Sequence, residues 1–197
     1  MNATLPTHTE RPARLLVIVA HPRDADRALG GVVASWVAHG TQAWLVCVTS
    51  GEGRSDDAGA DPLELAAAIE RGQRATAATI GYTAVTFLHR PEGALVNDLA
   101  LREQLVRQIR STRPDAVATH DPRVIVSDDG YVNHVDHREC GAAAIDAVSP
   151  AAANALAFPS LVRSESLGPH RVARLYLFWS ERPTVRVDTV DGGSEAL

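Results

Sequence analysis

Two short segments of the sequence carry side chains that can bind a metal ion. His21 and Asp24 follow the end of an apolar run, and His134 and His137 lie in the segment Asn133-His134-Val135-Asp136-His137. Two histidines and a carboxylate, with a fourth position left for water, form the ligand set of a catalytic zinc centre rather than a structural one. The spacing therefore predicts a metal site that supports hydrolysis.

Arg23 lies between the first two of these ligands. Activation of water at a metal is assisted by a carboxylate that accepts a proton, whereas a guanidinium stays charged at any working pH. A cation beside the ligands also disfavours Zn²⁺ unless its long side chain turns away or pairs with an acid. Asp26, Asp136 and Glu52 are candidate partners for it. Metal binding and catalysis therefore need separate evidence.

The composition indicates one compact domain. The chain has 197 residues, of which 45% are hydrophobic and 22% are charged, and this fits a single core. We expect residues 1–13 to be a disordered lead-in, residues 14–190 to form the domain and residues 191–197 to be a flexible tail.

The charge pattern excludes some classes of partner. The net charge is −5 and the arginines are scattered among acidic residues, so neither nucleic acid nor an anionic membrane is expected to bind. No apolar stretch reaches the roughly 18 residues of a membrane span, and the N-terminus lacks the apolar core of a signal peptide. We expect a cytoplasmic protein with a small-molecule partner, and a homo-oligomer stays an open alternative.

Apolar runs rich in β-branched residues alternate with segments of helical character. The runs predict strands over residues 15–20, 43–49, 85–88, 116–119, 174–179 and 184–187. Helices are predicted over residues 30–37, 63–81, 99–111 and 138–148. This alternation is typical of an α/β fold with a mainly parallel sheet and helices on both faces.

Polar residues follow several of the predicted strands. In parallel sheets ligands bind beyond the carboxyl ends of the strands, so the loops at this rim are expected to form the site. They supply candidate substrate contacts, namely Glu52, Arg54, His120 and Tyr131. Trp179, at the end of a late strand, is expected to pack in the core, with a subunit contact as the alternative. The first turn reads His-Pro-Arg-Asp and is not glycine-rich, which disfavours a nucleotide-binding domain.

At this point the motifs can be compared with a known family. The segments that carry the resemblance are Ala20-His21-Pro22-Arg23-Asp24-Ala25-Asp26 with Gly30-Gly31, Thr49-Ser50-Gly51-Glu52, Arg113-Pro114-Asp115, Thr119-His120-Asp121-Pro122 and Asn133-His134-Val135-Asp136-His137-Arg138. In order and spacing they resemble the LmbE-like or PIG-L family of zinc-dependent N-deacetylases. The resemblance implies a Rossmann-like fold. It also implies hydrolysis of an N-acyl group, usually acetyl, from an amino sugar, a thiol conjugate or a natural-product precursor.

The resemblance also implies roles for individual residues. His21, Asp24 and His137 match the metal ligands, for Zn²⁺ or another divalent metal. His134 matches the histidine that stabilises the oxyanion or protonates the leaving amine. Arg23 stands where the family has the aspartate that acts as general base.

Two further acidic residues match family positions. Asp136 corresponds to the acid that would orient and charge the catalytic histidine, and Asp26 to an acidic position of the first motif.

Family members continue past Asp188 into a further helix, whereas nine residues follow it here. A more open pocket, or a wall supplied by a partner chain, is the expected consequence.

The arginine leaves alternatives open. In one, the protein is a working hydrolase in which His134, Asp26 or Glu52 takes the role of base, and Arg23 binds an anionic substrate group bidentately. In another, the protein is a degenerate family member that binds metal or ligand without turnover. An arginine introduced deliberately or by drift into an active scaffold cannot be separated from this second alternative by sequence.

Overall fold

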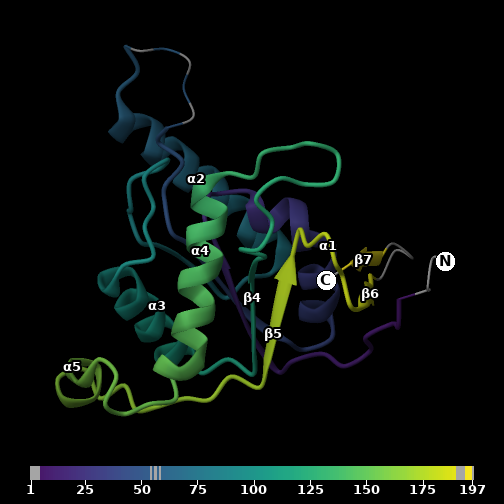
Figure 1. Ribbon diagram of the computed structural model, residues 1–197, viewed down its shortest axis with the longest axis vertical. Helices are drawn as coiled ribbons and strands as arrows, with labels where there is room; N and C mark the ends of the chain where they lie inside the picture. The colour runs from purple at the N-terminus through teal and green to yellow at the C-terminus, as the bar shows by residue number, and fades with distance from the viewer. Residues whose placement is uncertain (1–4, 54, 56, 58, 190–193, 197) are drawn as a thin grey trace.

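The protein is described here by a computed structural model, in which residues 5–53, 55, 57, 59–189 and 194–196 are described (Figure 1). Its elements, in chain order, are β1 (Arg14–Val19), α1 (Asp24–Ala38), β2 (Gln42–Cys47), α2 (Pro62–Ile80), β3 (Ala84–Phe87), α3 (Leu99–Thr112), β4 (Ala116–His120), α4 (Val135–Asp146), η1 (Ala147–Ala151), α5 (Pro159–Arg163), β5 (Arg174–Phe178), β6 (Arg186–Asp188) and β7 (Ser194–Ala196). Strands and helices alternate as the sequence predicts.

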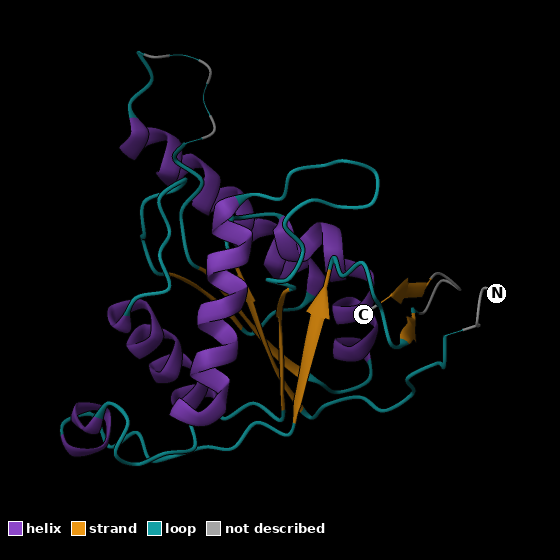
Figure 2. Cartoon of the chain, viewed as in Figure 1, coloured by secondary structure: helices purple, strands orange, loops and turns teal. Residues whose placement is uncertain are grey.

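Five of the strands form the central sheet, in the order β3-β2-β1-β4-β5. Each of the four pairings is parallel, from β1 with β2 to β4 with β5. The predicted α/β fold with a mainly parallel sheet is therefore confirmed (Figure 2). Because β1 pairs with β2 on one side and with β4 on the other, the strand order reverses at β1. A crevice at such a reversal is the usual ligand site of these sheets.

Alternate residues of β1 pack into two separate cores. Leu15, Val17 and Val19 belong to the cluster that includes α1 side chains such as Leu29 and Val32. Leu16 and Ile18 belong to a second cluster, with side chains from α3 and α4. Since successive strand residues point to opposite faces, this division shows that helices cover the sheet on both sides. β1, which carries the first site motif at its end, is buried from Leu15 to Val19.

Two helices begin three or more residues earlier than predicted, and both changes concern the site. α1 begins at Asp24 rather than at residue 30, and its first turn contains Asp24 and Asp26, whose charge suits the positive end of a helix. α4 begins at Val135 rather than at residue 138, because the His134 side chain caps it by accepting a hydrogen bond from the Asp136 N–H. Each motif therefore straddles a loop and the first turn of a helix.

α4 lies unusually close to β4 at Gly141. A Cβ at this position would be 2.4 Å from the carbonyl oxygen of His120, so only glycine allows the helix to approach. We expect Gly141→Ala to lower the free energy of unfolding by about 1–3 kcal/mol, the usual cost of overpacking. Gly72→Ala is the matched control, because no atom lies within 4 Å of its Cβ position. Urea unfolding that shows no difference between the two variants would contradict this packing.

The two ends of the described chain meet beside the central sheet. The β6–β7 pair is antiparallel, and Thr7 forms a parallel bridge with Arg186 of β6. Residues 5–13 of the expected lead-in and residues 194–196 of the expected tail are thus placed, whereas residues 1–4, 190–193 and 197 lie outside the described residues. Across the described part of the chain, the helices are too short or too polar to cross a membrane.

Candidate metal centre

Three elements bring the predicted ligands together at the carboxyl edge of the sheet. His21 follows β1, Asp24 begins α1, and His137 lies on the first turn of α4. His21 and Asp24 are 3% and 4% exposed, and the His137 side chain is 11% exposed. The site is therefore built where the parallel strands end, as the sequence predicts.

The three side chains present their ligand-type atoms to one point. His21 Nδ1 lies 3.2 Å from Asp24 Oδ2 and 3.2 Å from His137 Nε2, and His137 Nε2 lies 3.5 Å from Asp24 Oδ2. These atoms fall within 4.8 Å of one another, which is compatible with one metal ion. We call His21, Asp24 and His137 the metal triad.

The hydrogen bonds behind the metal triad decide which ring nitrogens carry protons. His21 Nε2 lies 3.0 Å from Asp136 Oδ2, and His137 Nδ1 lies 3.0 Å from Asn133 Oδ1. Since carboxylate and amide oxygens are acceptors, each ring donates there and leaves its other nitrogen unprotonated. Both unprotonated nitrogens face Asp24. Three lone pairs converging on one point fit a bound cation. Hydrogen bonds from the far ring nitrogens to acceptors such as Asp136 and Asn133 usually accompany zinc–histidine sites.

Asp24 is held in its ionised form. Burial works to raise its pKa, but the adjacent imidazoles of His120, His137 and His21, which favour the charged carboxylate whenever they carry a proton toward it, outweigh burial and hold the pKa well below the usual range. The His21 pKa is raised in the absence of a metal, because its bonds to Asp24 and Asp136 outweigh burial. A proton can therefore occupy the site in place of a metal, and metal binding would release it.

His120 lies behind the metal triad rather than in contact with solvent. It is 1% exposed, and its ring stacks on His137 with centroids 4.3 Å apart and planes 9° from parallel. Its Nε2 accepts a hydrogen bond from the Ala20 N–H, and burial lowers its pKa to about 4, so the ring is neutral at pH 7. His120 thus supports His137 and does not reach a substrate.

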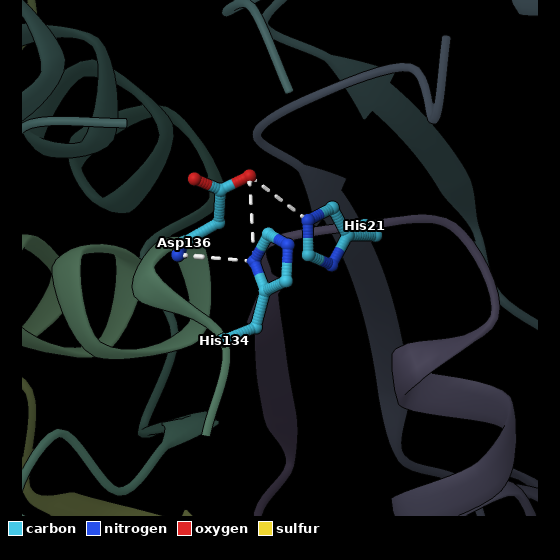
Figure 3. A group of neighbouring side chains, drawn as sticks. All are labelled: His21, His134 and Asp136. Carbon is cyan, nitrogen blue, oxygen red and sulfur yellow. Dashed lines mark hydrogen bonds and ion pairs between the residues drawn. The ribbon is translucent and has the colours of Figure 1, made fainter. Parts of the chain in front are cut away.

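Asp136 joins the two motifs (Figure 3). It is fully buried, and its carboxylate accepts hydrogen bonds from the Gly93 and Leu95 N–H groups as well as from His21. Its Oδ2 lies 3.0 Å from His21 Nε2 but 3.7 Å from His134 Nδ1. The structure therefore pairs Asp136 more closely with the candidate metal ligand His21 than with His134.

His134 lies at the mouth of the site, and its side chain is 42% exposed. Its Nδ1 accepts a hydrogen bond from the Asp136 N–H at 3.2 Å, so in the neutral ring the proton is on Nε2. Burial, assisted by the nearby His21, lowers the pKa of His134 and favours this neutral form. His134 can therefore donate one hydrogen bond from Nε2 toward a bound molecule.

A cavity of about 620 Å³ opens over the metal triad. This volume lies within the roughly 300–1,000 Å³ typical of small-molecule sites. Two of the predicted functional residues outside the triad, His134 and Tyr131, line it. Among the described residues, the lining does not include Arg23, Asp26, Glu52 or His120. Arg54, a further predicted substrate contact, lies outside the described residues.

The Arg23 backbone and the Asp26 side chain contact α2, and neither residue is among the described residues that line the cavity. The Arg23 N–H donates to Gln73 Oε1 at 2.6 Å, and Gln73 Nε2 donates to Asp26 Oδ1 at 3.1 Å. The reason is helical geometry, since Asp26 follows Asp24 by two residues and so lies about 200° around α1 from it. Burial raises the pKa of Asp26. The Arg23 side chain is exposed, and the backbone has the left-handed φ of 73°.

Several cavity residues were not found by sequence reasoning. Glu92 and Arg27 line the cavity, and Asn133 both lines it and fixes His137. Asn133 could have been found from its spacing, because it lies four residues before His137 at the start of a helix.

Trp179 also lines the cavity and is 42% exposed, so its expected place in the core is wrong. Its left-handed φ of 55° turns it out of β5 toward His137.

Fold and site together define a class of protein: a Rossmann-like α/β domain with a His-Asp-His cluster that could hold a metal ion at the strand reversal. Comparison with known sequences narrows this class. The profile of the family described as "PIG-L: GlcNAc-PI de-N-acetylase" matches residues 16–148, which is more than half of the sequence. The chain therefore belongs to the PIG-L family, as its motifs predict.

Individual relatives support the same placement. The chain is 27% identical over 181 residues to the diacetylchitobiose deacetylase of Thermococcus kodakarensis, a match that covers 90% of this chain and 64% of the relative. The N,N'-diacetylchitobiose deacetylase of Pyrococcus horikoshii superposes with a TM-score of 0.83 at 25% identity, covering 91% of this chain and 65% of that one. The chain thus spans about two thirds of the length of these relatives.

A third similarity concerns the fold alone. The 4-carboxy-2-hydroxymuconate hydratase of Pseudomonas putida KT2440 superposes with a TM-score of 0.69 at 21% identity, covering 86% of this chain and 67% of that one. An enzyme named for a different reaction therefore has a similar fold. The reaction of this protein has to be argued from its site.

Proposed function

We propose that this protein is a zinc-dependent N-deacetylase that removes an acetyl group from the nitrogen of an amino sugar or a related conjugate. The convergence of His21 Nδ1, Asp24 Oδ2 and His137 Nε2 beneath an open cavity is the observation that carries the proposal. Two neutral histidines and one carboxylate form a three-ligand set that leaves a position for water, as in catalytic zinc sites.

Zn²⁺ held by these residues would lower the pKa of water toward about 7 and polarise an amide carbonyl. The chain supplies the rest of the chemistry. The His134 Nε2–H, at the mouth of the site, is placed to hold the acyl oxygen as negative charge develops or to pass a proton to the leaving amine. Asp136 holds His21 with its Nδ1 unprotonated.

The relatives favour an acetylated amino sugar as substrate. Family membership and similarity to two diacetylchitobiose deacetylases make this the preferred substrate class. The cavity volume of about 620 Å³ has room for a sugar, and Tyr131 and Trp179 offer aromatic surface in its wall. Thiol conjugates and natural-product precursors form the wider class of N-acylated compounds to be assayed.

The alternative is a protein that binds metal or ligand without turnover, because Arg23 stands in place of an aspartate. The position of Arg23 disfavours this alternative, since its side chain is exposed and is not among the described residues that line the cavity. The cation therefore does not occupy the site. Turnover then depends on whether another group takes the proton.

The test is acetate release. Zinc-loaded protein is incubated with N-acetylglucosamine, N,N'-diacetylchitobiose and a panel of N-acetyl conjugates. Free amine and acetate are both measured, and we expect them in equal amounts. We expect His134→Gln to lower kcat by about 10²–10³-fold, the typical loss for one transition-state donor, with zinc content unchanged. Absence of turnover on every compound by protein with a full complement of zinc would favour the non-catalytic alternative.

A further inference from the structure

The loop between β3 and α3 places a carboxylate beside the metal triad. Glu92 lines the cavity, and its side chain is 10% exposed. Its Oε1 lies 3.7 Å from His21 Nε2. Glu92 thus approaches the site from a loop that contains none of the ligands.

Two hydrogen bonds with the loop after β2 fix the position of Glu92. Its Oε2 accepts a hydrogen bond from the Gly53 N–H at 2.8 Å, and its own N–H donates to Glu52 Oε1 at 2.8 Å. Glu52 Oε2 in turn accepts from the Ser50 N–H. These bonds hold one carboxylate oxygen of Glu92 and aim the other toward His21. Glu52 therefore acts on the site through Glu92 rather than by direct contact.

The other acidic residues near the site have different contacts. Asp24 belongs to the metal triad, Asp26 faces Gln73, and Asp136 is fully buried and accepts three hydrogen bonds. Glu181 lines the cavity and is exposed. Within the described part of the chain, no ion pair joins Glu181 to a triad residue. Among the described cavity carboxylates, Glu92 is thus the one left to serve a water in the cavity, because it lines the same cavity as the metal triad and its Oε1 borders the His21 ring at Nε2.

We propose that Glu92 is the general base of this enzyme and fills the role that an aspartate has at the position of Arg23. The inference rests on the proposed function. The Glu92 carboxylate takes a proton from water as the water oxygen forms a bond to the acyl carbon and the carbonyl electrons move to oxygen. The C–N bond then breaks, and the proton passes to the amine, so that acetate and free amine are the products.

Binding of a hydroxamate tests this role without turnover. Acetohydroxamate places its oxygens where water and the acyl oxygen would lie, and it is held through a proton shared with the base. We expect Glu92→Gln to weaken acetohydroxamate binding to the zinc-loaded protein by at least about tenfold in calorimetry, with zinc content unchanged. Asp26→Asn, a carboxyl-to-amide change outside the cavity, should leave binding within about twofold. Equal affinity of the wild type and Glu92→Gln would overturn the proposal.

Kinetics on an accepted substrate provide the second measurement. Glu92→Gln should lower kcat by about 10²–10⁴-fold with little change in KM, and formate should restore part of the rate of Glu92→Ala. A kcat that is kept in Glu92→Gln and lost in Asp26→Asn would assign the base to Asp26. If the wild type releases no acetate, the proposed function fails, whereas the hydroxamate measurement still decides the position of Glu92.

Discussion

Replacing Asp24 by Asn is expected to abolish tight zinc binding and to lower deacetylation by more than about 10³-fold. In the proposed site Asp24 would supply the one charged ligand, and its carboxylate lies within 3.5 Å of His21 Nδ1 and His137 Nε2, the two proposed ligand nitrogens. An amide has the same shape but no charge, so it cannot balance a divalent ion. The loss should exceed the 10²–10³-fold typical of one hydrogen-bond donor, because the metal itself leaves.

Asp26→Asn is the matched control for this change. It makes the same substitution two residues later on α1, where the side chain contacts Gln73 instead of the metal triad. We expect this variant to bind zinc like the wild type. Zinc content is measured by elemental analysis and acetate release by a coupled assay. Retention of zinc by Asp24→Asn, or equal loss by both variants, would show that Asp24 is not a ligand.

Asp136→Asn should weaken zinc binding by about 10–100-fold, although Asp136 is outside the triad. An asparagine amide that accepts from the Leu95 N–H, as Oδ1 of Asp136 does, would turn its NH₂ group toward both His21 Nε2 and the Gly93 N–H, which contact Oδ2 in the wild type. His21 would then carry its proton on Nδ1, which is the nitrogen that faces the metal. The variant should also be less stable, because a buried acceptor for backbone N–H groups is altered.

Zinc titration against a chelator measures this effect, and urea unfolding of the metal-free protein separates it from loss of stability. Asn133→Asp is a useful companion, because it keeps an oxygen facing His137 Nδ1 and should retain zinc. If Asp136→Asn bound zinc as tightly as the wild type while kcat fell, Asp136 would act on His134 instead, the role that family resemblance implies for it.

The fold and the metal triad could be predicted from the sequence because both depend on short-range patterns. Alternation of apolar strands and helices defines the parallel sheet, and the ends of its strands then define the rim. The pairs His21 with Asp24 and His134 with His137 each lie within one loop and the helix turn that follows. Spacing along the chain therefore translated directly into proximity in space.

The remaining parts of the site depend on how loops fold onto one another. Glu92 reaches His21 because Glu52 and Gly53 bind its loop about 40 residues away in the sequence, and no local pattern reports such a contact. Trp179 enters the cavity through a left-handed backbone conformation after β5. Conversely, Asp26 lay at the rim by sequence but faces α2, because two residues of helix turn it away from Asp24.

The most direct test is the metal content of the purified protein, with His137→Ala prepared alongside. The metal triad predicts about one zinc per chain in the wild type and its loss from the variant, since His137 Nε2 is one of the three proposed ligands. Circular dichroism of the variant would show that the fold persists. A wild-type protein that is purified without metal and fails to bind added zinc would contradict the account, because the metal triad would then not be a metal-binding site.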